Sequence, residues 1–209
     1  VQSRPALHIT IDTDLYTAVL TEQGGAVKSF VLKNHREEND KDSPGKQLIR
    51  TDDKSGFPLK FSWGSLISPD ALYDSSTQNI SLVEGKDSDS LTLSSDTGTG
   101  VVVQRLYTFS KDKYYIDMEV RVKNTSTNPL QGAAQIQQVN TPFQPLTAAN
   151  RFLFVGPAAY VDESLEEVKA KEFEENPKSV KGRIDWAGYQ GTYFTCSVAP
   201  HEKDGVTFT

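Results

Sequence analysis

The chain has 209 residues and a formal net charge of −6, from 28 acidic and 22 basic side chains. This balance argues against broad binding of nucleic acids or anionic membranes, because both require clustered lysine and arginine. The lone cysteine excludes an internal disulfide, and the sequence holds no CxxC motif or Cys/His cluster for zinc.

The opening stretch predicts three consecutive strands. His8–Asp12 alternates apolar and polar residues, Leu15–Leu20 is a second apolar run, and Ala26–Leu32 is a third. Between the last two lies the pair Gly24 and Gly25. Because glycine adopts positive φ without a Cβ clash, this pair suits a tight reversal between antiparallel strands.

The next part of the chain predicts short strands separated by polar loops. Lys33–Gly45 is expected to be a charged surface loop, followed by strands at Gln47–Arg50 and at the alternating stretch Phe57–Trp63. Asn79–Val83 and Ser90–Ser94 are expected to be two strands around a turn.

The clearest predicted pair joins Val101–Phe109 to Tyr114–Lys123, and Leu130–Val139 is expected to add another strand. In the first of these, alternation places five side chains on one face: Val101, Val103, Arg105, Tyr107 and Phe109.

One segment has a helical pattern. Asp162–Glu175 begins with a possible capping residue, and Val161, Leu165 and Val168 have helical spacing, although the many charges also allow an extended surface arm. Elsewhere strands recur at short intervals with turn signals between them. We therefore predict an all-β fold, a large antiparallel supersandwich of the galactose-mutarotase type with at most one or two short helices.

The same pattern predicts one domain over residues 1–209. The sequence has no initiator methionine and ends within an expected strand, so we expect a piece of a longer protein, truncated at its C-terminal end.

No arrangement of residues indicates catalysis. His8, His35 and His201 lack the spacing of metal ligands and are expected on the surface, while Cys196 lies in an apolar strand and is expected to be a small buried residue. The acidic residues gather in loops rather than in converging buried pairs. We therefore predict no catalytic residue, cofactor or metal, and a protein that is not an enzyme.

Late motifs carry a resemblance to a known family. They are Gly156-Pro-Ala-Ala-Tyr160, a charged run that ends at Phe173, Lys181-Gly-Arg-Ile-Asp-Trp186, and Gln190-Gly-Thr-Tyr-Phe194 followed by Ala199-Pro200. Together with the Gly24-Gly25 strand pair, they resemble the periplasmic domain of the membrane insertase YidC. Within these motifs, Trp186 is expected to be a buried anchor.

The resemblance implies a domain on the periplasmic side of the bacterial inner membrane, within a multi-pass protein that inserts and folds membrane proteins alone or with the Sec translocon. Its implied partners are Sec accessory subunits and nascent membrane proteins, without nucleic acid, and the fragment itself is expected to be monomeric. As a partner-binding surface we select Tyr160, Leu165 and Phe173, because a charged arm beside an apolar turn suits an interface rim.

An alternative is a carbohydrate-binding or aldose-epimerase-like protein, since the opening strands also resemble that family. Trp63, Tyr107, Tyr114 and Tyr115 could then stack on a sugar. Epimerase chemistry requires histidines in the central strands, and Val101–Phe109 and Tyr114–Lys123 contain none.

Overall fold

The computed structural model describes residues 4–83, 85–141, 154–169, 172 and 178–209. All regular elements in these ranges are strands, and nearly all of their pairings are antiparallel. This confirms the prediction of an all-β antiparallel sandwich. Within the same ranges, the structure contains no helix with the length and apolar character needed to cross a membrane.

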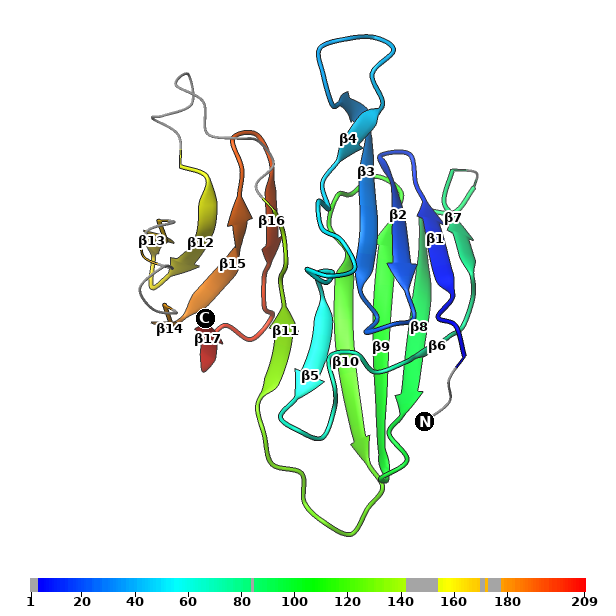
Figure 1. Cartoon of the computed structure of the whole chain (residues 1–209), viewed down its shortest axis with the longest axis vertical. Helices are drawn as coiled ribbons and strands as arrows, with labels where there is room; N and C mark the ends of the chain where they lie inside the picture. Colours follow the sequence, from blue (N-terminus) through cyan, green and yellow to red (C-terminus); the bar gives the residue numbers. More distant parts are fainter. Residues whose placement is uncertain (1–3, 84, 142–153, 170–171, 173–177) are drawn as a thin grey trace. The chain divides into compact units, whose positions relative to one another are not determined.

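The chain divides into two compact units, residues 1–139 and 140–209, which are described separately. The single domain over residues 1–209 stays a prediction. In the first unit, the five-stranded sheet has the order β4-β3-β2-β1-β7, with β1 (His8–Asp12), β2 (Tyr16–Thr21), β3 (Val27–Arg36), β4 (Gly45–Gln47) and β7 (Asn79–Ser81) (Figure 1).

A four-stranded sheet of order β10-β9-β8-β6 forms the other layer of this unit, and β5 and β11 form a separate pair. The strands are β5 (Lys60–Trp63), β6 (Asp74–Ser75), β8 (Ser88–Asp96), β9 (Val101–Ser110), β10 (Asp117–Asn124) and β11 (Ala134–Gln137). Alternate side chains of both sheets form the core, including Ile9, Ile11, Tyr16, Leu20, Leu91, Leu93, Val103 and Phe109.

The predicted reversal at Gly24 and Gly25 is confirmed. Their φ angles are +69° and +58°, and they connect the antiparallel strands β2 and β3. A Cβ on Gly24 would lie 2.6 Å from the carbonyl oxygen of Pro69, which only glycine avoids.

The expected pairing of Asn79–Val83 with Ser90–Ser94 is wrong. β7 instead pairs in parallel with β1, with Ile80 opposite Ile11, whereas β8 lies between β9 and β6. The pairing with β1 extends the five-stranded sheet and buries Ile80 and Leu82. Local alternation defines the faces of a strand but not its neighbour.

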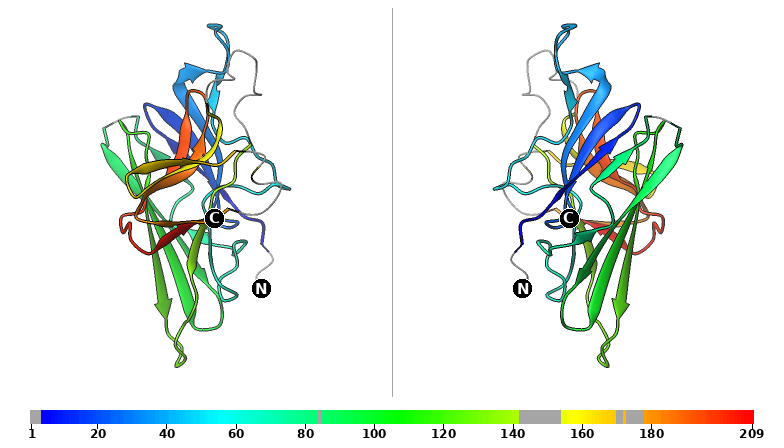
Figure 2. Two further views of the ribbon diagram at one scale, coloured as in Figure 1. Left: turned by 90° about the vertical axis from the view of Figure 1, so that its left-hand side faces the viewer. Right: turned by 90° about the vertical axis from the view of Figure 1, so that its right-hand side faces the viewer.

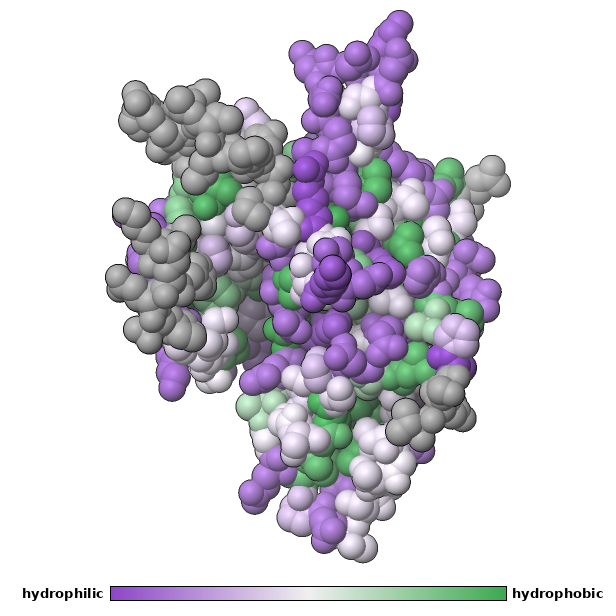
Figure 3. Space-filling view, viewed as in Figure 1, coloured by the Kyte–Doolittle hydropathy of each residue, from purple (hydrophilic) through white to green (hydrophobic). Residues whose placement is uncertain are grey.

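Several expected boundaries also differ from the structure. The strand expected at Gln47–Arg50 is β4, which begins at Gly45 and ends at Gln47. Lys33–Arg36 belongs to β3, so that the charged segment forms the end of the β3–β4 hairpin and gives a strongly hydrophilic surface (Figure 3). The strand predicted at Phe57–Trp63 begins only at Lys60, because Leu59 has a φ of +69° that interrupts the alternation.

The second unit contains a four-stranded antiparallel sheet of order β13-β12-β15-β16 and a short pair, β14 with β17 (Figures 1 and 2). The strands are β12 (Gly156–Val161), β13 (Ser164–Glu167), β14 (Val180–Gly182), β15 (Ile184–Gln190), β16 (Thr195–Val198) and β17 (Val206–Phe208). Its small core consists of Ala159, Val161 and Ile184, against which Val180, Ala187, Val206 and Phe208 pack.

Candidate partner-binding surface

The sheet of the second unit brings two of the three predicted partner-binding residues together. Tyr160 of β12 lies directly opposite Leu165 of β13, and on its other side it lies opposite Trp186 of β15. Directly opposed side chains in an antiparallel sheet point to the same face. The three residues therefore form one row across three strands, named here the aromatic row.

The aromatic row lies on the sheet face away from the small core. Ala159 and Val161 flank Tyr160 along β12 and point to the core face, because successive side chains of a strand alternate. Leu165 is 47% exposed, and Tyr160 and Trp186 are half-buried. Trp186 is thus not the buried anchor expected from the sequence.

A tight turn forms the edge of this surface. Asp162 and Glu163 have φ angles of +48° and +64°, and Val161 pairs with Ser164, so these two residues form the loop of a β-hairpin with the positive φ angles of a type I′ turn. The backbone N–H of Arg183 donates to Asp162 Oδ1 at 2.9 Å, and the Asp162 N–H donates to the Arg183 carbonyl.

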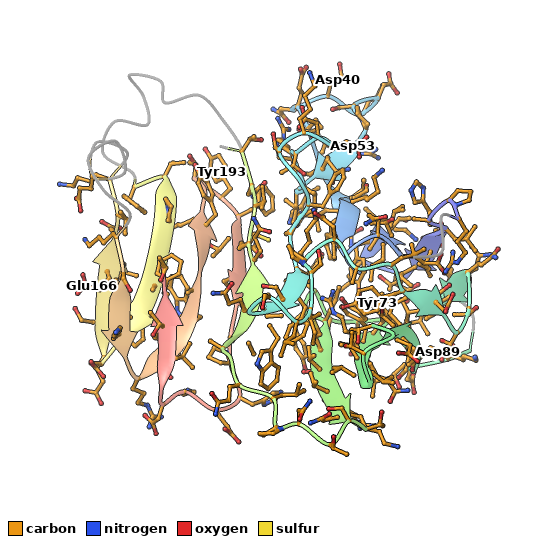
Figure 4. All side chains as sticks on the ribbon, turned by 60° about the horizontal axis from the view of Figure 1, so that its bottom comes forward. Asp40, Asp53, Tyr73, Asp89, Glu166 and Tyr193 are labelled. Atoms are coloured by element: carbon orange, nitrogen blue, oxygen red, sulfur yellow. The ribbon has the colours of Figure 1, made fainter. Side chains whose placement is uncertain are left out.

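The prediction of a helix at Asp162–Glu175 is therefore wrong for residues 162–167, which form the turn and strand β13. The pairing of β13 with β12 satisfies the backbone groups that a helix would have paired internally. Phe173, the third predicted residue, lies outside the described residues. Glu167 of β13, two residues after Leu165, adds a carboxylate on the face of the row, whereas Glu166 lies opposite Ala159 and belongs to the other face of this outermost strand (Figure 4).

The first unit contains a buried cation on the core face of β9, the face on which the alternation of Val101–Phe109 places it. Arg105 of β9 is fully buried. Its Nη1 donates to the Gly24 carbonyl at 2.7 Å, and its Nη2 donates to the carbonyl of Leu59. None of the ion pairs in the described part of the chain includes Arg105. Its acceptors are the two backbone carbonyls and the Met118 Sδ, which accepts from Nη2 at 3.3 Å, while its buried Nε has no acceptor among the described residues.

Two tyrosines complete the surroundings of Arg105. The guanidinium carbon lies 5.3 Å from the ring centre of Tyr107 and 5.8 Å from that of Tyr73, within the range of cation–π attraction. The Tyr107 hydroxyl donates to the Gly25 carbonyl at 2.9 Å, and burial raises the pKa of Tyr107 to about 12. This arrangement joins β9 to the reversal between β2 and β3.

A buried carboxylate joins other parts of the same unit. Glu22 is 1% exposed and accepts hydrogen bonds from Arg4 Nη1, the Leu7 N–H, and the N–H and hydroxyl of Ser75 at 2.5–3.0 Å. Burial alone would raise the pKa of Glu22, but these hydrogen bonds outweigh it and lower the pKa to about 2. The carboxylate therefore stays ionised at neutral pH.

The residues considered for chemistry do not converge. His8, His35 and His201 are exposed, and Cys196 is half-buried on β16. Within the described ranges, no group of three or more His, Cys, Asp or Glu side chains could hold a metal ion. Of the four residues considered for sugar stacking, Tyr107 is buried against Arg105, Trp63 is half-buried, and Tyr114 and Tyr115 are exposed.

These features define an antiparallel β-sandwich domain. Its buried charged groups, Arg105 and Glu22, are held by partners within the fold, with only the Arg105 Nε left without an acceptor among the described residues. Its aromatic row includes the exposed Leu165.

The family model described as "YidC periplasmic domain" matches residues 8–209, and the chain belongs to this family. It is 32% identical over 195 residues to a membrane protein insertase YidC of Syntrophus aciditrophicus, covering 92% of this chain and 36% of the relative. It is also 31% identical over 191 residues to the YidC of Pelobacter propionicus, covering 91% and 35%. The YidC of Geobacter metallireducens is 30% identical over 191 residues, again with 91% and 35% covered.

The chain thus spans about a third of the length of these curated relatives. Its family assigns the domain to the periplasmic side of the inner membrane. This confirms the predicted family and location.

Proposed function

We propose that this domain is a non-catalytic interaction module of a membrane protein insertase. In this proposal the parent protein inserts and folds inner-membrane proteins, and the domain contacts nascent membrane proteins and accessory subunits of the Sec translocon. The observation that carries the proposal is the aromatic row of Leu165, Tyr160 and Trp186 on the face of the second unit's sheet opposite its small core.

The composition and support of this row suit protein binding. Tyrosine and tryptophan contribute large contact areas and are enriched where binding energy concentrates in interfaces. Backbone ladders on both sides of β12 hold Tyr160, so its position requires little ordering on binding. The neighbouring carboxylate of Glu167 on the same face supplies a polar rim.

The two buried charged groups of the first unit have structural partners, which is consistent with a role without catalysis. Glu22 has a strongly lowered pKa, but its carboxylate is occupied by Arg4, Leu7 and Ser75. The guanidinium of Arg105 contacts backbone carbonyls and two tyrosine rings inside the sandwich. These groups are buried, and their contacts stabilise the fold.

The test uses the full-length parent protein with Tyr160→Ala and Leu165→Ala combined, and a second variant that adds Phe173→Ala. Matched controls are Tyr115→Ala and Leu66→Ala, which remove exposed side chains of the same kinds from the first unit. We expect co-purification of Sec subunits and cross-linking to a nascent membrane protein to fall several-fold only in the row variants. Unchanged recovery of both partners in the row variants would contradict the proposal.

A further inference from the structure

Within the described ranges, strand β10 is hydrogen-bonded to a neighbouring strand along one side only. It pairs with β9 over its whole length, from Asp117 opposite Thr108 to Asn124 opposite Val101, and it is the terminal strand of its sheet. Among the described residues, no other strand pairs with it. A free edge of 8 residues presents a row of unpaired N–H and C=O groups to any strand that can align with it.

The core-side face of β10 is incompletely covered. Met118, Val120 and Val122 lie opposite buried residues of β9, yet all three remain half-buried. An added strand would cover part of this apolar stripe, because neighbouring strands place their side chains about 5 Å apart. The edge therefore offers both backbone pairing and apolar contact.

The outer face carries four exposed charges in a particular order. Asp117 and Glu119 precede Val120, and Arg121 and Lys123 follow it, so the charges are of opposite sign at equal distances from Val120. In a two-fold symmetric interface, if residue i contacts residue j, then j contacts i. A strand with this charge order is complementary to an antiparallel copy of itself.

We propose that β10 pairs antiparallel with β10 of a second copy of this chain, with Val120 opposite Val120. Glu119 then lies opposite Arg121 and Asp117 opposite Lys123, each pair occurring twice, while Met118 lies opposite Val122 on the core side. Opposite charges placed in this way stabilise a sheet. The two four-stranded sheets become one continuous sheet, in contrast to the monomer expected from the sequence alone.

The charges select this register. A shift of two residues in either direction places Glu119 opposite Glu119 or Arg121 opposite Arg121, and such like-charge pairs are destabilising. After a shift of one residue, residues of β10 whose N–H and C=O groups point toward the second copy lie opposite residues whose groups point away from it. The register centred on Val120 is the one that satisfies both the backbone and the charges.

The first test is sedimentation equilibrium of the full chain at low salt. Arg121→Glu should weaken dimerisation about tenfold or more, because two attractive pairs become repulsive. The charge swap Glu119→Arg with Arg121→Glu should restore it, since residues 119 and 121 again have opposite signs. Lys111→Glu, at an exposed ion pair outside β10, is the control and should have no effect.

The second test is disulfide trapping in a Cys196→Ser background. Val120→Cys faces itself across the two-fold axis and should form a cross-linked dimer. Val122→Cys, on the same face, should not, because its copies lie four residues or about 13 Å apart. A chain that stays monomeric at about 1 mM, a swap that fails to restore dimerisation, or equal cross-linking at both positions would overturn the proposal.

Discussion

The two units of the chain use polar and charged residues in different ways. The unit of residues 1–139 buries Arg105 and Glu22. Backbone carbonyls and the Met118 sulfur hold Arg105, and N–H groups, a hydroxyl and the Arg4 guanidinium hold Glu22. The unit of residues 140–209 has a small apolar core around Val161 and Ile184 and leaves the aromatic row accessible. The comparison shows that a buried charge or a shifted pKa in this protein belongs to a group that stabilises the fold. The proposed binding role belongs instead to side chains at a sheet surface.

The largest effect should follow from Arg105→Ala. This variant removes the donor to the Gly24 and Leu59 carbonyls and leaves a cavity between Tyr73 and Tyr107, so we expect a loss of about 4 kcal/mol in the free energy of unfolding. Urea denaturation followed by fluorescence measures it. Lys111→Ala, at an exposed ion pair outside β10, is the control with an expected change below about 0.5 kcal/mol. Equal stabilities of the two variants would contradict the role of the buried guanidinium in stabilising this unit.

Glu22 makes stability depend on acid pH. Its pKa is lowered from 4.5 to about 2 in the folded state, so its contribution is present above pH 4.5 and is lost as the pH falls from 4.5 through about 2. The shift corresponds to about 3 kcal/mol. We expect Glu22→Gln to flatten the stability profile between these pH values, measured by thermal unfolding. The same slope in the variant and the unmodified chain would contradict the assignment to Glu22.

A third prediction concerns the contact between the reversal and Arg105. A Cβ on Gly25 would lie 2.5 Å from Arg105 Nη1 and requires a φ of +58°, so Gly25→Ala should cost about 2 kcal/mol or more. Gly98→Ala is the matched control, since its φ is +72° but no atom lies within 4 Å of its added Cβ. It should cost only the backbone strain of about 1 kcal/mol. Equal costs would show that the space beside Arg105 is unimportant.

The smallest effect should occur in the aromatic row. Leu165→Ala removes an exposed side chain from an edge strand, and we expect a change in stability within about 0.5 kcal/mol. Ile184→Val, in the core of the same unit, should cost about 1 kcal/mol. A larger loss for Leu165→Ala than for Ile184→Val, measured by urea denaturation, would mean that Leu165 serves packing.

Much of the first unit could be predicted from the sequence. Alternation located β1, β2, β9 and β10 and placed Arg105 on the core face, and glycine chemistry located the reversal at Gly24 and Gly25. The partner of β7 could not be predicted, because pairing with β1 depends on which sheet edge remains free.

The candidate surface was predicted in part. Tyr160 and Leu165 were selected, but a helix was expected where the chain forms a turn at Asp162 and Glu163. The helical spacing of the apolar residues favoured that helix, so the cross-strand pairing of Tyr160 with Leu165 was not predicted. Trp186 was expected to be a buried anchor and was not selected, although it is only half-buried. Only the strand register places it beside Tyr160, and large aromatic side chains are more often buried.

The most direct test of the proposed function is site-specific photo-cross-linking in the full-length insertase during synthesis of a membrane protein. The cross-linking residue replaces Leu165 in one variant and Lys181, an exposed residue of β14, in the control. We predict cross-links from position 165 to the nascent chain or to a Sec subunit and none from position 181. Equal labelling from both positions, or none from position 165, would contradict the assignment of the aromatic row as the partner-binding surface.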